Sequence, residues 1–128
     1  MALRVVRLGT PRHPDEGLRI GTVRHPPRGV RKEEFASRDF YDVWYPELSP
    51  SSPLVKQALA ATTDKEWGDF VRLFRKEMAR PEPRHALELL AALSHHTDLS
   101  VGCYCEDEAR CHRVVLRELL GEHGAELV

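Results

Sequence analysis

The sequence has 128 residues, of which 41% are hydrophobic and 30% are charged, so it predicts one domain that spans residues 1–128. No apolar run approaches the roughly 20 residues of a membrane helix, and the first residues lack the apolar segment of a signal peptide. These features exclude secreted, membrane and disordered proteins. We expect a cytoplasmic protein with no membrane partner.

Basic residues are concentrated at the start of the chain. Residues 1–32 carry a net charge of +6 and the remainder carries −7, although the whole chain has a net charge of −1. A basic segment attracts phosphate, nucleotides or nucleic acid, so a nucleic-acid partner is one interpretation. In the other, acidic helices pack against a basic edge and the charges cancel within the fold.

The first part of the chain is expected to form strands joined by loops. It is rich in loops because seven of the nine prolines fall within the first 53 residues. Alternating apolar residues predict strands over residues 3–8 and 18–24, and an aromatic strand is expected over residues 41–45. The second strand runs into a stiff, cationic loop, His25-Pro26-Pro27-Arg28-Gly29.

The next part is expected to be helical. A Ser-Pro pair predicts a helix over residues 53–60, and the capping-box spacing of Thr63 and Glu66 predicts the start of a second helix. The second helix has an apolar face at helical spacing, formed by Trp67, Phe70, Val71, Phe74 and Met78. Pro81 and Pro83 should separate it from a third helix, which carries Leu87, Leu90 and Ala91.

The last part completes an α/β fold. An apolar run over residues 99–105 predicts a central strand, and a helix should run from Cys111 to about Gly121. The acidic residues 106–108 between them are expected to be a solvated loop face. Strands mixed with helices predict a single compact domain whose small, mainly parallel sheet is flanked by helices.

The three cysteines, Cys103, Cys105 and Cys111, lie within nine residues of one another. A disulfide framework would instead spread an even number of cysteines along the chain. We therefore expect a local cluster of reduced thiols, as in proteins of the cytoplasm.

This cluster lies where a strand ends and a helix begins, which is where open α/β sheets bind ligands. A helix start offers unpaired N–H groups and a positive dipole end, which favour an anion and stabilise a thiolate. Cys111 is therefore the expected reactive residue, with His112 as its base or orienting group. Arg110 and Arg113 would bind the anion beside it.

Three interpretations of the cluster stay open. In the first, Cys111 is a nucleophile or a redox thiol. In the second, the three cysteines and His112 bind zinc, although C-x-C-x5-C-H is not a standard zinc spacing. Adjacent helical residues also point about 100° apart, which makes a shared ion awkward for Cys111 and His112. In the third, Cys103 and Cys105 are small core residues. We assign no metal ligand and leave the cofactor unknown.

The cationic loop is a second candidate element. Arg24 ends a strand, and Arg28 follows two prolines that restrict the loop, so a guanidinium there suits phosphate or carboxylate. A surface salt bridge is the alternative for these arginines. Tyr41 and Trp44 are aromatic residues that either stack on a base or sugar or belong to the core.

Several familiar active sites are excluded by the sequence. It contains no C-x5-R loop of cysteine phosphatases and no C-x-x-C of thioredoxin-like proteins. It also lacks the phosphate-binding G-x-x-x-x-G-K-[ST] loop and the G-x-G-x-x-G fingerprint of dinucleotide-binding folds.

The motifs resemble those of the DUF488 family, small bacterial and archaeal proteins. Its usual form is an apolar strand, C-x-E, an acidic loop, and C-H-R at a helix start, which Cys103 and Cys111-His112-Arg113 match in register. Cys105 stands where many members have the glutamate. Thr22-Val23-Arg24 is similar to the family's D-V-R with Thr in place of Asp, and the segment after it is similar to W-P-R-G.

The resemblance covers nearly the whole chain. It implies a compact cytoplasmic α/β domain in which the cationic loop and the C-H-R motif meet at one site, formed by Arg24, Arg28, Cys103, Cys111, His112 and Arg113. The resemblance implies no reaction. From the residues themselves we expect a thiol-dependent site for a small anionic ligand, phosphorylated or nucleotide-like. The alternatives are a non-catalytic nucleotide or nucleic-acid binding module and a zinc-stabilised structural domain. The sequence does not indicate the oligomeric state.

Overall fold

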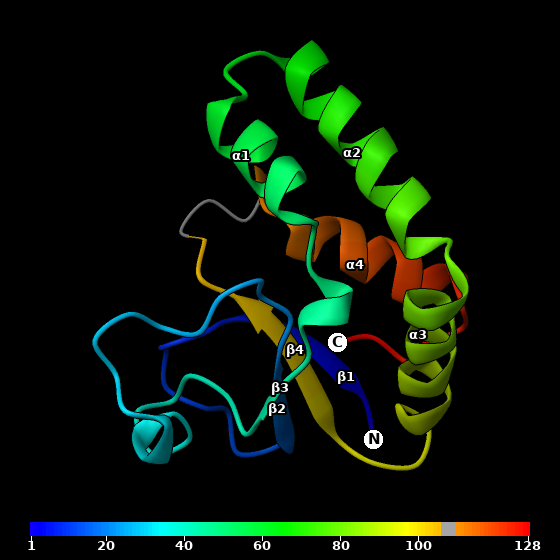
Figure 1. Ribbon diagram of the computed structural model, residues 1–128. Coiled ribbons are helices and arrows are strands. Elements are labelled where there is room, and N and C mark those ends of the chain that lie inside the picture. Colours follow the sequence, from blue (N-terminus) through cyan, green and yellow to red (C-terminus); the bar gives the residue numbers. More distant parts are fainter. Residues whose placement is uncertain (106–109) are drawn as a thin grey trace.

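The computed structural model describes residues 1–105 and 110–128. Within these residues, four parallel strands form one sheet in the order β1-β4-β2-β3 (Figure 1). The strands are β1 (Leu3–Arg7), β2 (Leu18–Gly21), β3 (Val43–Trp44) and β4 (Leu99–Cys103). The parallel sheet confirms the α/β fold class that the sequence predicts.

The described residues also contain four α-helices and two short 3-10 helices. The α-helices are α1 (Ser52–Ala60), α2 (Asp64–Met78), α3 (Pro81–Leu93) and α4 (His112–Glu122), and the 3-10 helices are η1 (Lys32–Glu34) and η2 (Pro46–Leu48). α3 begins at Pro81 and contains Pro83, whereas the sequence analysis expected both prolines before the helix. Proline is tolerated there because the first helical N–H groups have no partner within the helix.

Strand β4 occupies the centre of the sheet, as its apolar run predicts. All five of its residues are buried, and it pairs with β1 on one side and β2 on the other. Gly102 permits the close approach of β1, because a Cβ at this position would lie 2.6 Å from the carbonyl oxygen of Val6.

Strands β2 and β3 are shorter than the sequence analysis expected. One backbone hydrogen bond beyond Gly21, from the Thr22 N–H to the Gly102 carbonyl at 3.0 Å, continues the pairing of β2 with β4, and after it side chains bind backbone groups. The indole Nε1 of Trp44 donates to the carbonyl of Val23 at 2.7 Å, and Arg24 donates to the carbonyl of Pro50 at 3.0 Å. Val23 and Arg24, which take part in these bonds, begin the loop that borders the candidate site.

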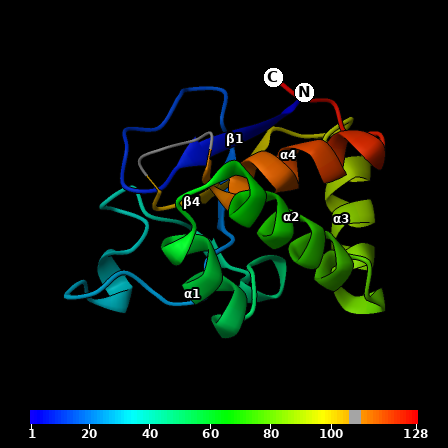
Figure 2. The same ribbon diagram turned by 90° about the horizontal axis from the view of Figure 1, so that it is seen from above.

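The four α-helices of the described residues gather on one side of the sheet (Figures 1 and 2). The main core lies between them and the sheet, and Leu99 and Val101 of β4 share it with Phe70, Phe74 and Leu116 of the helices. Helix α2 begins as its capping box predicts, because the Thr63 hydroxyl accepts a hydrogen bond from the Glu66 N–H at 3.1 Å. None of the described helices combines the length and apolar character that a bilayer crossing requires.

The other face of the sheet carries a buried ion pair that the sequence analysis did not predict. Arg19 is fully buried and donates from Nη2 to Glu16, which is 2% exposed, at 2.9 Å. Ser100 of β4 also donates to Glu16, at 2.8 Å. Arg19 Nη1 donates to the carbonyls of Thr10 and Asp39 at 2.9 and 2.6 Å. The pair thus fastens two loops to the central strand.

Candidate functional site

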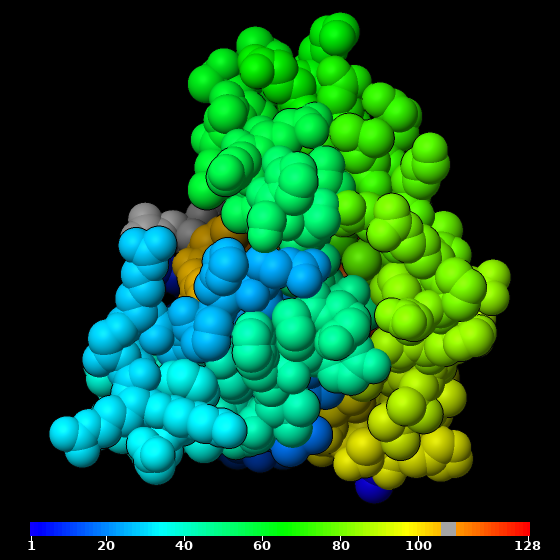
Figure 3. All heavy atoms as spheres, viewed as in Figure 1, coloured from blue at the N-terminus to red at the C-terminus, as the bar shows by residue number. Residues whose placement is uncertain are grey.

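A cavity of about 630 Å³ lies at the carboxyl ends of β2 and β4. This is the edge at which open parallel sheets bind ligands. Its walls come from the segment after β2, from α1 and α2, and from the segments around the end of β4 and the start of α4. In Figure 3 the residues at the end of β4 (yellow-orange) are recessed between the segment after β2 (blue) and α1 (green).

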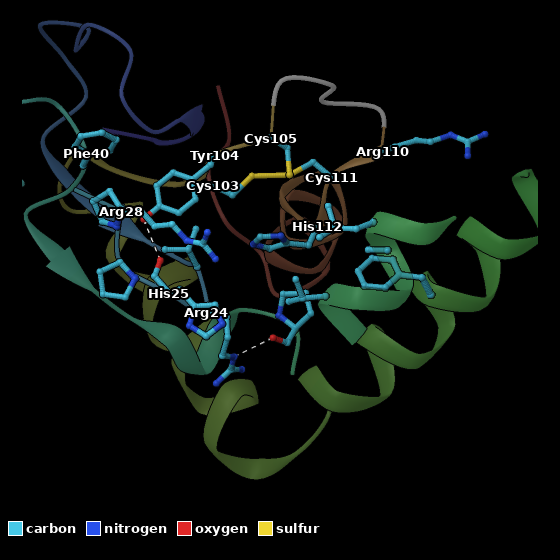
Figure 4. Close-up of a pocket in the computed structure, with 18 residues that line it drawn as sticks. Arg24, His25, Arg28, Phe40, Cys103, Tyr104, Cys105, Arg110, Cys111 and His112 are labelled. Atoms are coloured by element: carbon cyan, nitrogen blue, oxygen red, sulfur yellow. Dashed lines mark hydrogen bonds between the residues drawn. A yellow bond between two sulfur atoms is a disulfide. The ribbon is translucent and has the colours of Figure 1, made fainter. Parts of the chain in front are cut away.

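Most of the sequence-predicted site residues meet in this cavity (Figure 4). The predicted residues that line it are Arg24, Arg28, Cys103, Cys105, Arg110, Cys111 and His112. They arrive there because each lies at or just beyond the carboxyl end of a strand, or at the start of the helix that follows it. Arg113, Tyr41 and Trp44 do not line it. The acidic residues 106–108 lie outside the described residues.

Cys103 and Cys111 form a sulfur pair in the cavity wall. The structure joins their sulfur atoms as a disulfide, in contrast to the three unpaired thiols that the sequence analysis expected (Figure 4). The pairing arises because Cys103 is the last residue of β4 and Cys111 is the N-cap of α4. Their Cα atoms are 7.9 Å apart, which is wider than the usual 4.4–6.8 Å of disulfides.

The ring of His112 is held from two sides. Its Nε2 lies 2.6 Å from the carbonyl oxygen of Thr22, and the ring of Phe74 meets it edge-on at 5.8 Å. A carbonyl only accepts hydrogen bonds, so Nε2 carries the hydrogen and Nδ1 of the neutral ring holds a lone pair. Burial lowers the pKa of His112 to about 4, and the charge of Arg113 acts in the same direction. The ring is therefore uncharged at neutral pH.

The arginines have different surroundings. Arg24 is tied to the backbone, since it donates to the carbonyls of Pro50 and Ser49 at 3.0 and 3.1 Å. Arg110 donates to Asp64 at 2.7 Å and points away from the other labelled residues (Figure 4). Arg28 is exposed at the cavity and has no hydrogen bond or ion pair within the described residues. It is the cation best placed to meet an anionic ligand.

Arg113 is buried beside the site without lining the cavity. It is 5% exposed, and its Nε and Nη1 have no hydrogen-bond partner among the described residues. Its effect on the site is electrostatic, because its positive charge disfavours protonation of His112. The anion-binding role that the sequence analysis gave to Arg113 stays a prediction.

Two aromatic residues of the cavity were missed by the sequence analysis. Phe40 and Tyr104 both line it, and their rings meet edge-on with centroids 6.3 Å apart. The Tyr104 hydroxyl donates to the carbonyl of His25 at 3.1 Å, which ties the end of β4 to the cationic loop. Burial raises the pKa of Tyr104. Its position between two candidate cysteines was the signal available in the sequence, whereas Phe40 carried none.

The side chains of Tyr41 and Trp44 lie outside the cavity and contact other parts of the fold. Tyr41 is buried over Gly21 and packs edge-on against Phe35 at 5.2 Å. Trp44 is partly exposed, and its indole nitrogen binds the Val23 carbonyl. Among the described residues they support the loops around the site but do not reach its cavity.

Comparison with known proteins identifies one family. A family model described as the active DUF488-N3 subclade, DUF488-N3a, matches residues 3–124. No curated protein and no solved structure matches the chain. The match covers both the cationic loop and the Cys-His-Arg segment, so it includes all the residues that line the cavity.

Proposed function

Because the chain belongs to the DUF488 family and matches the subclade described as active, we propose that it is an enzyme for a small anionic molecule. The molecule has a flat, largely apolar body and a phosphate or similar anionic group, as a nucleotide does. It binds in the cavity, where the thiol cluster reacts with it or supports its reaction. The protein works in a reducing, cytoplasmic setting, which keeps the thiols available.

The observation that carries this proposal is the composition of the cavity wall. Val55, Ala58 and Leu59 of α1 offer an apolar surface, and Phe40 and Tyr104 add two rings. Ligand cavities are mostly apolar, with a few polar groups that fix orientation. Arg28 supplies a positive group at the same cavity, so a molecule with a flat body and one anionic end fits the chemistry of the wall.

The thiol cluster supplies the reactive end. Cys111 caps α4, and the first N–H groups of this helix and its dipole favour negative charge at that point. In the proposed enzyme, reduced Cys111 acts at the cavity wall and His112 orients it. Cys103 and Cys105 are the supporting thiols. The low pKa of His112 favours an orienting role over that of a base at neutral pH.

The distribution of charge favours a small ligand over nucleic acid. Arg12 is paired with Asp42, Arg19 with Glu16, and Arg24 with backbone carbonyls. Three of the eight cations of residues 1–32 are therefore held by contacts within the fold. A broad basic surface, which nucleic-acid binding requires, is correspondingly reduced.

Substitution of Arg28 by Ala tests the proposal. Adenosine 5′-monophosphate and adenosine have the same base and sugar and differ only in the phosphate. Comparing their affinities therefore separates binding of the flat body by the apolar wall from binding of the phosphate by Arg28. We expect the protein to bind the monophosphate more tightly than the nucleoside. Arg28→Ala should weaken monophosphate binding by a factor of about 10 to 150, because a charge-assisted hydrogen bond contributes about 1.5–3 kcal/mol. Calorimetric titration of reduced protein measures both affinities.

Arg31→Ala is the matched control, since Arg31 is exposed on the same segment but does not line the cavity. It should leave both affinities unchanged. Equal losses in the two variants would show a diffuse charge effect and contradict the proposal. So would equal binding of nucleoside and monophosphate, or affinity for single-stranded nucleic acid that exceeds both and falls steeply with salt.

A further inference from the structure

The thiol cluster has a second chemical capacity, which is to hold a metal ion. One ligand atom from each of Cys103, Cys111 and His112 can be chosen so that all three lie within 4.8 Å of one another. Two sulfurs and one imidazole nitrogen form the donor set that suits zinc. All three residues also line the cavity, so an ion among them would face the proposed ligand.

The surroundings of His112 are those of a metal ligand. A ligating histidine commonly donates its other ring N–H to a carboxylate or a backbone carbonyl, which fixes the ring and its tautomer. Here the Thr22 carbonyl accepts from Nε2 at 2.6 Å, and Phe74 supports the ring. The remaining nitrogen, Nδ1, therefore carries the lone pair that a metal needs.

The backbone at Cys111 allows Cys111 and His112 to share an ion. The expected divergence of about 100° applies only if Cys111 and His112 are both helical. Cys111 is instead the N-cap of α4 and has extended backbone angles, φ −129° and ψ 145°. Its side chain can therefore share a point with that of His112. The Cα separation of 7.9 Å between Cys103 and Cys111, wide for a disulfide, also suits two ligands on either side of one ion.

We propose that reduced Cys103 and Cys111, together with His112, bind one Zn²⁺ ion whose fourth position opens to the cavity. Three protein ligands and an open position are typical of catalytic zinc, whereas structural zinc has four protein ligands. Cys105 packs beside the two other cysteines but is not part of the group within 4.8 Å, so the proposal counts three ligands among the residues that the structure describes.

Binding of Zn²⁺ changes no oxidation state, so it needs no oxidant or reductant once the cysteines are reduced. The two thiols release their protons, and the resulting thiolates and the neutral imidazole coordinate the ion. Where Cys103 and Cys111 are joined as a disulfide, a thiol reductant must first supply two electrons and two protons. With zinc bound, Cys111 would serve as a ligand and no longer as a free nucleophile, and the ion would supply a Lewis acid toward a molecule in the cavity. This inference rests on the proposed function for its chemical purpose, but zinc binding is testable without an organic ligand.

Metal analysis of purified protein tests the inference. The full chain is purified with a thiol reductant and without chelator, and its zinc content is measured by mass spectrometry. Wild type and Cys105→Ser should each contain about one zinc ion per chain, whereas Cys103→Ser and Cys111→Ser should contain less than about a tenth of that. Cobalt titration of stripped wild type and Cys105→Ser should give thiolate charge-transfer bands of equal intensity.

Two results of the metal analysis would overturn the inference. Wild type without zinc after reduction would show a thiol or disulfide site only. Loss of zinc from Cys105→Ser, or a weaker cobalt band in that variant, would show a closed site with a third thiolate. The cobalt comparison holds even if Cys103→Ser or Cys111→Ser fails to fold. If the protein binds the monophosphate but contains no zinc, only this inference is contradicted. If it contains zinc but does not bind the monophosphate, only the proposed substrate class is contradicted.

Discussion

Replacement of Arg19 by Met should lower the free energy of unfolding by about 3–5 kcal/mol, the usual cost of removing one partner from a buried ion pair. The substitution leaves the Glu16 carboxylate buried with Ser100 and one backbone N–H. It also removes the donors to the carbonyls of Thr10 and Asp39. Urea denaturation of both proteins at neutral pH measures the difference.

Arg12→Met is the matched control, because Arg12 forms its ion pair with Asp42 on the partly exposed side of the same loops. It should cost about 1 kcal/mol or less, since water screens such pairs. An Arg19→Met protein that is no less stable than Arg12→Met would contradict the role of the buried pair.

The same pair sets a pH dependence. Burial raises the pKa of Glu16, but the hydrogen bonds from Arg19 and Ser100 outweigh it and hold the pKa below its ordinary value of 4.5. The contribution to stability is therefore complete above about pH 4.5 and is lost as the pH falls through the lower value of the folded state. Glu16→Gln should accordingly be less stable than wild type at pH 7, and the difference should shrink in acid.

Replacement of Phe74 by Ala should have an effect of similar size, about 3–5 kcal/mol, because it empties a large volume in the core. Phe74 is fully buried, stacks on Phe70 at 5.8 Å and supports the His112 ring. The substitution should thus loosen the candidate site as well as the core. Urea denaturation gives the stability, and zinc affinity of the folded fraction reports on the His112 ring.

Two controls accompany Phe74→Ala. Phe74→Leu keeps most of the volume and should cost less than half as much. Leu89→Ala removes a side chain that is 60% exposed on α3, and it should change stability by no more than about 0.5 kcal/mol. If Phe74→Ala lowered the free energy of unfolding no more than Leu89→Ala does, the result would contradict the described packing of α2 against α4 and the sheet.

The sequence predicted those parts of the fold that depend on local signals. The start of α2 follows from Thr63 and Glu66, which are neighbours on one helical turn, and its buried face follows from spacing alone. The central place of β4 follows from its uninterrupted apolar run, because only a central parallel strand is buried on both faces.

The buried ion pair could not be predicted in this way. Glu16 and Arg19 have the sequence appearance of a solvated turn, and Ser100, which donates a hydrogen bond to Glu16, is 84 positions away from it. The hydrogen bonds of Trp44 and Arg24 near the ends of β3 and β2 likewise reach carbonyls 21 and 26 positions away. Contacts of this kind form only when distant segments meet in the fold, so no local sequence pattern indicates them.

The site was predictable where strand ends determine position. Arg28, Cys103 and Cys111 reach one cavity because parallel strands bring their carboxyl ends to the same edge. The direction of each side chain was not predictable: Arg110 turns to Asp64, and Tyr41 turns into the core. The extended backbone of Cys111 is another such case, since the sequence does not distinguish the N-cap from the first helical residue.

The most direct test is alkylation of the three cysteines in folded protein, mapped by mass spectrometry after treatment with reductant and chelator. The account requires that Cys103 and Cys111, although each is only 1% exposed, react through the cavity before the protein unfolds. We predict that both are then modified in the native state, and that zinc or adenosine 5′-monophosphate slows their modification. Reaction of these two residues only at denaturant concentrations that unfold the chain would contradict the account, because they would then be core packing.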